Sequence, residues 1–335
     1  MNYNGIKVLV TGADGFIGSH LVEALVRQGA DVTALCLYNS FDTHGWLDDV
    51  PLPVASSLRR VRGDVRDAAF VRRAVFGHEI VFHLAALIAI PYSYLSPQSF
   101  IDTNVLGTLN VLEASRDCGV SRIVQTSTSE VYGSAITLPI DESHPLQGQS
   151  PYSASKIGAD MMAEAFFRSF GLHVAILRPF NTFGPRQSER AVIGSTIRQM
   201  LDPTCSTLKL GALDTVRDFT FVEDTVRAFL AIGSGPEIKF GSPYNAGSGK
   251  AVTVGELVDL LRDLTGCDKH MEHESSRLRP ASSEVMALLA DSSKLATDAS
   301  WKPRVDLREG LALTVEWWRD RLSFGRVRRE TDFMA

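Results

Sequence analysis

Two short segments of the chain carry residue types that could together perform acid–base chemistry. Tyr152 and Lys156 stand four residues apart, so on a helix their side chains would lie on the same face, one turn apart. A lysine ammonium held beside a phenol lowers the pKa of the phenol and makes it a usable base. Upstream, Thr128 and Glu130 supply a hydroxyl and a carboxylate at the end of a predicted strand. We therefore predict one base for a hydroxyl proton and a second acid or base for a carbon or a leaving group.

The spacing of the tyrosine and the lysine does not by itself distinguish a site from an exposed helical pair, which is common. Three features favour a site: the residues between them are small, Pro151 suits the first turn of a helix, and a long loop precedes it. Glu130 alone would most often be a surface acid. Its place at the carboxyl end of a parallel strand favours function, because doubly wound sheets bind ligands there.

A glycine-rich turn near the N-terminus indicates a nucleotide-binding site. Gly12, Gly15 and Gly18 follow the first predicted strand and open the first predicted helix. Glycines in this context allow a tight turn, close approach of the backbone to a pyrophosphate, and an anion at the helix N-terminus. Asp64 follows a later strand and could hydrogen-bond the adenine amino group, although capping the next helix is equally compatible with its position.

The segment that usually selects between NAD and NADP leaves that choice open. NAD usually requires an acidic residue at the end of the second strand, whereas NADP requires a nearby arginine. In this chain the segment is Leu35-Cys-Leu-Tyr-Asn-Ser40, which contains neither.

The first half of the chain alternates β-branched runs with amphipathic stretches, which predicts repeated β-α-β units. The predicted strands are Lys7–Thr11, Asp31–Leu37, Leu58–Arg62, Ile80–Leu84, Arg122–Ser127 and His173–Leu177, and the predicted helices are Phe16–Gln28, Ala68–Phe76, Phe100–Cys118 and one around Tyr152. This order predicts an α/β fold with a doubly wound parallel sheet, a Rossmann fold. Strands that are apolar nearly throughout agree with a sheet covered on both faces.

After about Pro179 the pattern loosens and predicts a smaller, discontinuous C-terminal lobe that binds the substrate. The predicted elements there are a loop at Asn181–Gln187, helices at Ala191–Leu201, Val254–Thr265 and Leu307–Leu322, and a short strand at Arg217–Val222. We predict a dinucleotide-binding domain over residues 1–178, with returning segments from the second half, and a lobe formed mainly by residues 179–335. The side chains of His270, Glu272, His273 and Glu274 resemble a set of metal ligands but lack its fixed spacing, so we expect a solvated loop and no metal site.

Composition limits the class of protein. A net charge of −5 over 335 residues argues against a general nucleic-acid binder. The four scattered cysteines suggest neither a disulfide framework nor a zinc site. The N-terminus lacks the features of a signal peptide, and no apolar run is long enough to span a bilayer, so we expect a cytoplasmic protein with no membrane partner. Arg186, Arg217 and Arg279 could be surface charges, but guanidinium groups in loops also suit a diphosphate.

The motifs together resemble the extended short-chain dehydrogenase/reductase superfamily. The resemblance rests on the Gly12–Gly18 turn, His83-Leu-Ala-Ala86, Asn104, Thr128-Ser-Glu-Val-Tyr-Gly133 and Tyr152-x-x-x-Lys156. Over essentially its whole length the chain is similar to the sugar-nucleotide 4,6-dehydratases, GDP-mannose dehydratase among them. Residues 86–94 and 185–192 look most like the GDP-N-acetylglucosamine 4,6-dehydratases of legionaminic-acid synthesis.

This resemblance implies a nucleotide-sugar substrate, a tightly bound NAD or NADP with NAD favoured, and a homodimer. The implied cofactor-binding residues are Gly12, Asp14, Gly15, Phe16, Ile17, Gly18, Asp64, Val65, Leu84, Ala85, Ala86, Asn104, Ser127, Tyr152, Lys156 and Pro179. The implied substrate-binding residues are Ser129, Asn181, Arg186, Val192, Arg217 and Arg279, and the implied catalytic residues are Thr128, Glu130, Tyr152 and Lys156. The dimer would form through the helices around 100–118 and 152–170, although Ala159, Met162, Ala163 and Phe166 fit the protein's own core equally well.

We therefore expect an NAD(P)-dependent 4,6-dehydratase that converts an NDP-hexose, with GDP- or UDP-N-acetylglucosamine favoured, to its 4-keto-6-deoxy product. One departure concerns Ser129, because many hexose 4,6-dehydratases carry aspartate there as the acid for the leaving hydroxyl. The acid role would then pass to Glu130, directly or through Ser129 or water. An NDP-sugar 4-epimerase, a UDP-glucuronate decarboxylase and a cofactor-binding regulator without turnover are the alternatives.

Overall fold

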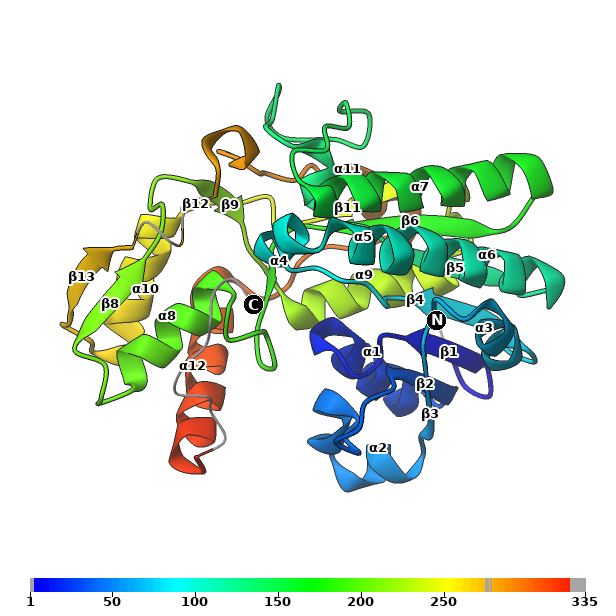
Figure 1. Cartoon of the computed structure of the whole chain (residues 1–335), viewed down its shortest axis with the longest axis horizontal. Helices are drawn as coiled ribbons and strands as arrows, with labels where there is room; N and C mark the ends of the chain where they lie inside the picture. The colour runs from blue at the N-terminus through cyan, green and yellow to red at the C-terminus, as the bar shows by residue number, and fades with distance from the viewer. Residues whose placement is uncertain (1–2, 275–276, 278, 326–335) are drawn as a thin grey trace.

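A seven-stranded parallel sheet forms the centre of the computed structural model, which describes residues 3–274, 277 and 279–325 (Figure 1). The strands are β1 (Lys7–Thr11), β2 (Asp31–Leu37), β3 (Arg59–Gly63), β4 (Ile80–His83), β5 (Arg122–Thr126), β6 (Val174–Pro179) and β11 (Pro243–Ala246). Their order is β11-β6-β5-β4-β1-β2-β3, and every neighbouring pair is parallel. The predicted α/β doubly wound fold is confirmed. Residues 326–335, which the sequence assigned to the C-terminal lobe, lie outside the described residues.

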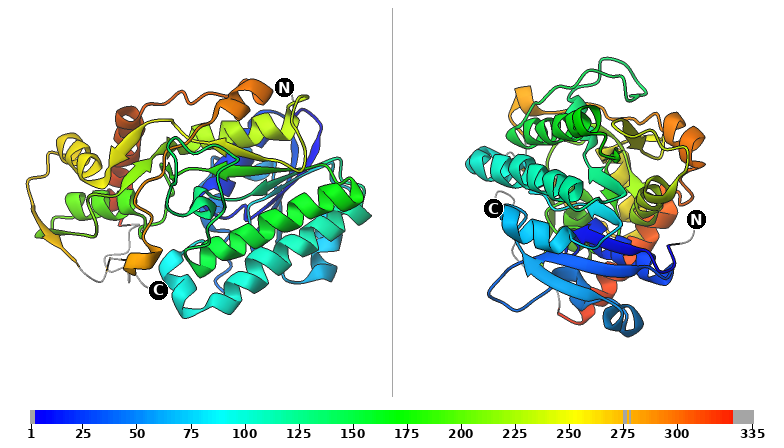
Figure 2. Two further views of the ribbon diagram at one scale, coloured as in Figure 1. Left: turned by 90° about the horizontal axis from the view of Figure 1, so that it is seen from above. Right: turned by 90° about the vertical axis from the view of Figure 1, so that its right-hand side faces the viewer.

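Helices cover both faces of this sheet because successive strand side chains alternate between them. In β1, Val8 and Val10 pack with α1 (Phe16–Arg27) and α9 (Val222–Ser234), whereas Leu9 packs on the opposite face. That opposite face is covered by α3 (Ala68–Val75), α6 (Gly107–Asp117) and α7 (Pro151–Phe170). Helices α6 and α7 run side by side along it (Figure 2).

A smaller lobe lies at one end of the sheet and contains three two-stranded sheets in the described residues. Its strands are β7 (Thr182–Phe183), β8 (Thr207–Leu210), β9 (Val216–Asp218), β10 (Thr220–Phe221), β12 (Ala251–Thr253) and β13 (His270–His273). The remaining long helices are α8 (Val192–Leu201), α10 (Val254–Thr265), α11 (Ser293–Ala299) and α12 (Leu307–Ser323). Helices α8, α10 and α12 pack against one another and give this lobe its own apolar contacts.

Short helical turns occupy the connections around the sheet. They are η1 (Gly45–Asp48), α2 (Leu52–Ser56), α4 (Ile90–Leu95), α5 (Pro97–Phe100), η2 (Ile101–Leu106), η3 (Ser129–Tyr132) and η5 (Ala281–Ser283). The single helix predicted over Phe100–Cys118 is therefore interrupted. Its first part, η2, is π-helical, and it contains Asn104, whose side chain hydrogen-bonds both the N–H and the carbonyl of Leu87.

Two predictions for the second half were wrong. The strand predicted over Arg217–Val222 is divided between β9 and β10, and Val222 begins helix α9, which has two acidic residues in its first turn. The expected loop at His270–His273 is strand β13, because it pairs with β8 in parallel. Both errors concern short strands of the small lobe whose pairing partners are distant in sequence.

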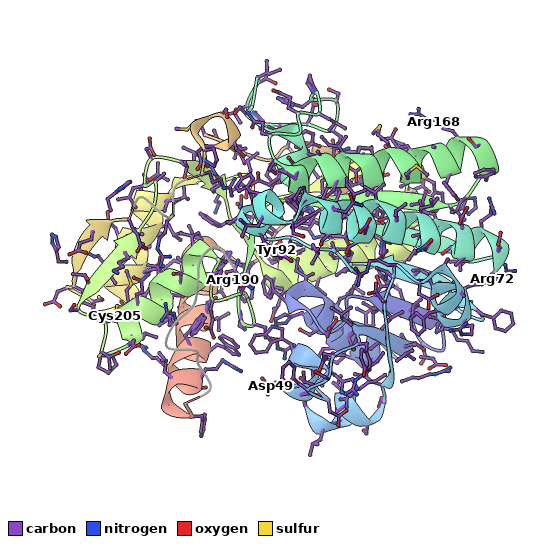
Figure 3. All side chains as sticks on the ribbon, in the orientation of Figure 1. Asp49, Arg72, Tyr92, Arg168, Arg190 and Cys205 are labelled. Carbon is purple, nitrogen blue, oxygen red and sulfur yellow. The ribbon has the colours of Figure 1, made fainter. Side chains whose placement is uncertain are left out.

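The carboxyl ends of the parallel strands face the smaller lobe, so residues that follow β1, β4, β5 and β6 gather there. Figure 3 shows Tyr92, on α4, near the middle of the molecule at this end, whereas Arg72 and Arg168 lie at the opposite end. Within the described residues, no helix is both long enough and apolar enough to cross a membrane.

Candidate active site

Thr128 and Glu130 lie just beyond the carboxyl end of β5. Thr128 is the N-cap of η3, and its hydroxyl accepts the N–H of Glu130 at 3.2 Å. This short helix turns the chain sharply after the strand, which keeps both side chains at the sheet edge. The structure thus brings together the hydroxyl and the carboxylate that the sequence predicted.

The first turns of α7 carry Tyr152 and Lys156, as predicted. Pro151 occupies the start of the helix, and a capping box fixes its beginning: Ser150 Oγ accepts the N–H of Ser153 at 3.1 Å, while Ser153 Oγ accepts the N–H of Ser150 at 2.9 Å. Because the helix can begin only here, the tyrosine falls in the first turn and the lysine in the second.

The phenol of Tyr152 is buried, and its ring packs at an angle of 78° to that of Phe100 with a centroid separation of 6.2 Å. Burial raises the pKa of Tyr152, and a hydrogen bond with the Thr128 side chain opposes this shift. The direction is opposite to the one expected from a neighbouring lysine. The expectation considered only the positive charge, whereas desolvation is the larger effect in the folded chain.

Lys156 is buried, and its Nζ donates to the Thr126 carbonyl at 2.5 Å. Burial lowers the pKa of Lys156 to about 8, and the carboxylate of Asp160 opposes that shift. The ammonium is therefore fixed to the end of β5, directly before Ser127 and Thr128.

Asp160, which the sequence did not single out, is the centre of a buried polar network. Its Oδ2 accepts the Ser127 hydroxyl at 2.7 Å and the Arg178 Nε at 3.0 Å. Arg178 Nη1 donates to the Tyr132 hydroxyl at 3.0 Å, and that hydroxyl donates to Asn245 Oδ1 at 2.7 Å. The network links α7, β5, β6, η3 and β11. The sequence feature that could have revealed Asp160 is its four-residue spacing from Lys156, which places it on the helix face that also carries Tyr152.

Glu130 faces two arginines and a second glutamate. Arg279 Nη1 lies 3.4 Å from both carboxylate oxygens of Glu130 and 4.0 Å from Glu284 Oε1. Arg217 Nη2 donates to Glu284 Oε1 at 3.2 Å. Two of the predicted diphosphate-binding arginines therefore lie beside the predicted base. The sequence did not single out Glu284, because no local pattern reveals its contact with Arg217.

The third arginine lies elsewhere. Arg186 pairs with Glu23 and donates to Ser19 Oγ at 3.3 Å, so it contacts α1 rather than Arg217 or Arg279. Asn181 presents a buried Oδ1 that has no hydrogen-bond partner among the described residues, as an atom awaiting a ligand would. Val192 begins α8 and is partly exposed, and Ser129 is buried.

The glycines of the turn before α1 allow it to pack closely against its own backbone. Gly12 has φ +66°, and a Cβ there would come within 2.7 Å of the Ala85 nitrogen; a Cβ on Gly18 would come within 2.1 Å of the Gly12 oxygen. Helix α1 begins at Phe16 with no side-chain cap and no acid in its first turn, so Ile17 and its neighbours leave the positive end of the helix open to an anion. The chain's own residues therefore fit a dinucleotide here.

Asp14 extends from this turn to the end of β2. Its Oδ2 accepts the Leu37 N–H at 3.2 Å, and its carbonyl accepts the Trp46 N–H at 3.0 Å. Ala13 N also donates to the Leu35 carbonyl at 3.2 Å, which seats the turn on β2. A carboxylate thus stands at the end of the second strand although the strand itself supplies none. Burial raises the pKa of Asp14.

Asp64 and Val65 follow β3. Arg66 Nε contacts both carboxylate oxygens of Asp64, at 3.0 and 2.9 Å, and this hydrogen bonding lowers the pKa of Asp64. The carboxylate is thus engaged by its own neighbour. Val65 is buried, and its carbonyl accepts Asn110 Nδ2 at 2.9 Å.

Asn104 and the residues after β4 lie at the same carboxyl edge of the sheet. Asn104 Nδ2 donates to Ser155 Oγ at 2.9 Å, and the Thr11 hydroxyl accepts the N–H groups of Leu84 and Ala85 at 3.2 and 3.1 Å. Ala86 follows directly, while Pro179 ends β6 opposite Ala246.

His83 is wholly buried between two threonine hydroxyls, Thr11 at 2.7 Å and Thr108 at 3.2 Å. Burial lowers its pKa to about 3, so the ring is neutral and packed.

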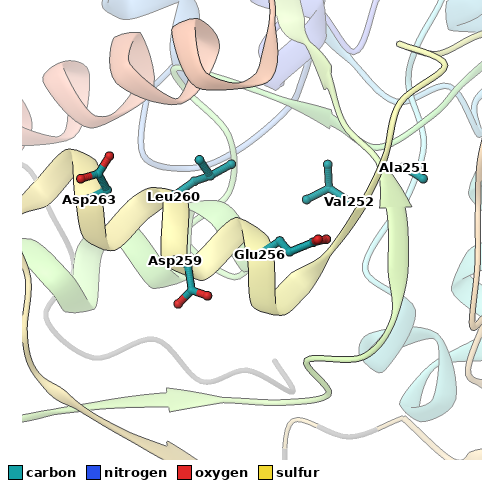
Figure 4. Close-up of a pocket in the computed structure, with 6 residues that line it drawn as sticks. All are labelled: Ala251, Val252, Glu256, Asp259, Leu260 and Asp263. Atoms are coloured by element: carbon teal, nitrogen blue, oxygen red, sulfur yellow. The ribbon is translucent and has the colours of Figure 1, made fainter.

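A pocket that lies away from the carboxyl edge of the central sheet can be excluded as the nucleotide-sugar site. It is lined by Ala251, Val252, Glu256, Asp259, Leu260 and Asp263 (Figure 4). Three carboxylates and no basic side chain line it, so it would repel a diphosphate. Among the described residues, no group of three or more His, Cys, Asp or Glu side chains is placed to hold a metal ion.

Comparison with known proteins agrees with the fold and the motifs. The family described as GDP-mannose 4,6-dehydratase matches residues 9–314. A dTDP-glucose 4,6-dehydratase of Actinoplanes is 33% identical over 322 residues, covering 94% of this chain and 98% of that protein. The structure of a Thermotoga maritima UDP-glucose 4-epimerase with UDP-glucose superposes with a TM-score of 0.85 at 31% identity, covering 95% of this chain and 100% of that one. A dTDP-glucose 4,6-dehydratase of Streptomyces venezuelae with NAD bound gives 0.83 at 32% identity, covering 95% and 98%.

The doubly wound sheet and the Tyr152/Lys156 helix define the class as an extended short-chain dehydrogenase/reductase. The chain belongs to the GDP-mannose 4,6-dehydratase family, and it is an enzyme of the sugar-nucleotide dehydratase and epimerase group.

The buried ammonium of Lys156 generates a prediction about stability and pH. Because burial depresses its pKa from 10.5 to about 8, the folded chain carries an unfavourable charge below pH 8 and releases it as the pH rises. Between about pH 8 and 10.5 the unfolded chain binds more protons, so stability must rise with pH in this range. We expect wild type to gain about 3 kcal/mol relative to Lys156→Met between pH 7 and pH 10, measured by urea unfolding.

The control is Lys250→Met, which removes an exposed lysine. The difference in unfolding free energy between wild type and Lys156→Met could instead stay constant with pH, as expected for the control variant. That result would refute the assignment of an unfavourable buried charge.

Proposed function

We propose that the protein is an NAD-dependent nucleotide-sugar 4,6-dehydratase that acts on an NDP-hexose, with GDP- or UDP-N-acetylglucosamine favoured. The observation that carries the proposal is the carboxylate of Glu130, two residues from Thr128 and at the same sheet edge as Tyr152. Oxidation of an alcohol needs only the hydroxyl and phenol groups. A carboxylate beside them supplies a base for a C–H proton, which elimination of water requires.

The cofactor proposal rests on the glycine turn and on Asp14. Gly12 and Gly18 let the turn close against its own backbone at the uncapped start of α1, where an anion is favoured. The carboxylate at the end of β2 suits a free ribose 2′-hydroxyl better than a 2′-phosphate. A bound NAD would supply reversible hydride chemistry, and the cofactor would be unchanged at the end of each turnover. A cofactor that is regenerated within each turnover must be held tightly.

The chain's own residues divide the remaining work. Tyr152 accepts the proton of the sugar O4 hydroxyl, and Thr128, which hydrogen-bonds the phenol, positions that oxygen. Lys156 supplies positive charge that favours phenolate. Once C4 is a ketone, the C5 proton is acidic enough for Glu130 to remove. Loss of the C6 hydroxyl as water and return of hydride to C6 give a 4-keto-6-deoxy product.

Substrate recognition is assigned to the arginines near Glu130 and to Asn181. Arg217 and Arg279 carry guanidinium groups that suit a diphosphate, and the unpartnered Asn181 Oδ1 offers an acceptor. Val192 lies farther along the same chain segment and would contact the nucleotide. Arg186 is paired with Glu23 on α1, so its proposed contact with the nucleotide requires that pair to open. Ser129 adjoins the two catalytic side chains.

Two alternative activities share these motifs. An NDP-sugar 4-epimerase is favoured by the likeness to epimerases, and a UDP-glucuronate decarboxylase would also begin with oxidation at C4. The epimerase leaves C6 unchanged and the decarboxylase releases it as carbon dioxide, so neither activity eliminates water. A cofactor-binding regulator would not need Thr128, Glu130, Tyr152 and Lys156 together, so the complete set favours turnover.

The proposed assembly is a cytoplasmic homodimer formed through α6 and α7. Ala159, Ala163 and Phe166 are buried in the chain's own core, so they are not available for the interface. Ile101, Leu106 and Met161 are instead exposed apolar side chains on η2 and α7, and they support the proposal.

The function is tested by incubating the purified protein with a panel of GDP- and UDP-sugars. We expect one substrate to lose the mass of one water. Glu130→Gln should lower dehydration by roughly 10²- to 10⁴-fold, as expected for loss of a general base, while nicotinamide reduction at 340 nm remains. The matched control, Glu237→Gln, changes an exposed glutamate and should retain activity. Unchanged substrate mass with inversion at C4, or release of carbon dioxide, would contradict the proposal, and so would full activity in Glu130→Gln.

The role of Asp14 predicts the cofactor preference. Replacing Asp14 by Asn should narrow the preference for NAD over NADP by about 10- to 100-fold, because it removes one charge-assisted hydrogen bond and a charge that repels phosphate. The measurement is calorimetric titration of nucleotide-free protein with each dinucleotide. Asp42→Asn is the control, because Asp42 is an exposed acid paired with Arg62. An unchanged ratio of the two dissociation constants in Asp14→Asn would overturn the assignment.

A further inference from the structure

Four charged side chains from distant parts of the sequence form a compact cluster beside the proposed base. We call Glu130, Arg217, Arg279 and Glu284 the four-charge cluster. Arg279 bridges the two glutamates, at 3.4 Å from Glu130 and 4.0 Å from Glu284, and Arg217 pairs with Glu284 at 3.2 Å. The side chains are 8–24% exposed, so water screens the cluster only partly. Two positive and two negative charges leave it neutral.

The segment that supplies Arg279 and Glu284 is fixed in place. Ser283 Oγ donates to the Gln149 carbonyl at 2.7 Å, and it lies 2.7 Å from the Tyr94 hydroxyl. These contacts tie the segment to the loop before α7 and to α4. Glu284 is therefore held at the site itself rather than on a free loop.

A nucleotide diphosphate would disturb the balance of charges. If Arg217 and Arg279 turn to phosphate oxygens, both glutamates lose their counterions, and about two further negative charges arrive beside them. Like charges in a poorly solvated site favour protonation of one member, as in pairs of carboxylates that share a proton. Among the described residues, the other titratable groups that face the cluster are Tyr152, on α7, and Tyr94, on α4. Burial raises the pKa of Tyr152, and a phenol carries no positive charge in either protonation state, so it cannot replace the arginines as a counterion.

We propose that Glu284 takes up a proton when the diphosphate binds and then donates it to the C6 hydroxyl as that group leaves. This inference rests on the proposed dehydratase function. Glu130 takes the C5 proton, the C5–H electron pair forms the C5–C6 double bond, and the C6–O bond breaks. The leaving hydroxyl receives the proton of Glu284 and departs as water, so Glu284 ends as a carboxylate and Glu130 as a carboxylic acid. One carboxylate and one carboxylic acid thus act as a pair, and the serine at position 129 needs no acidic role.

Proton uptake is measured first, by calorimetric titration of the cofactor-loaded protein with GDP and with UDP in buffers of different ionisation enthalpy. On binding the nucleotide, the wild-type protein should take up a measurable fraction of a proton per site, and at most one proton. Glu284→Gln should bind that nucleotide with much less uptake, whereas Glu237→Gln should behave as wild type. Binding without proton uptake in wild type would overturn the inference.

The catalytic role is measured with two substrates, the natural nucleotide sugar and its 6-deoxy-6-fluoro analogue. Fluoride needs less assistance from an acid than hydroxide does. Glu284→Gln should therefore lower kcat for the natural substrate by roughly 10²- to 10⁴-fold and lower it far less for the analogue, whereas Glu130→Gln should impair both. Glu284→Asp, which keeps a carboxyl group, should recover part of the activity.

Equal losses on both substrates, or a rise in KM with unchanged kcat, would show that Glu284 only orients Arg217 and would refute the donor role. Failure of the wild-type protein to dehydrate any nucleotide sugar is a different result, because it would refute the proposed function itself.

Discussion

Asp160 and Arg178 form an ion pair that is closed to water, and the elements that carry the proposed catalytic residues are joined through it. The aspartate holds Ser127 at the end of β5, and the arginine holds Tyr132 on η3. Thr128 and Glu130 lie between these two anchored positions. Removal of one partner would leave the other charge buried and unpaired, which commonly costs about 3–5 kcal/mol. The precision of the site therefore depends on a network that need not contact any ligand.

Burial of the site also disfavours the charged forms of its acid–base groups. It raises the pKa of the Tyr152 phenol and lowers the pKa of Lys156 to about 8, so desolvation works against the phenolate–ammonium pair that hydride transfer needs. A hydrogen bond with Thr128 opposes the rise in the pKa of Tyr152, and the charge of Asp160 opposes the fall in the pKa of Lys156 while adding to the rise at Tyr152. On the other side of the site, Glu130 is neutralised by Arg279. In the chain by itself, these acid–base groups are thus held in less reactive states. On the proposed mechanism, binding of a charged nucleotide makes them reactive.

Local patterns predicted much of the fold and less of the site. The strands Lys7–Thr11 and Asp31–Leu37 and the helix Val254–Thr265 were predicted to the residue, because their periodicity and caps are encoded within a few positions. Helix α9 was missed because Val222 continues an apolar run that looks like a strand. The contacts of Asp160 with Arg178, Glu284 with Arg217, and Arg186 with Glu23 join residues that no local pattern pairs. Asp14 shows the same limit, since the acid at the end of β2 comes from another loop.

The central claim is that one hydride leaves C4 of the sugar and returns to C6 of the same molecule, with water lost between the two steps. It is tested most directly with a nucleotide sugar that carries deuterium at C4, converted by the purified protein in ordinary water. The account predicts a 4-keto-6-deoxy product with the deuterium at C6 by NMR and mass spectrometry. Deuterium that remains at C4 of an epimer, or a product without deuterium at C6, would contradict it.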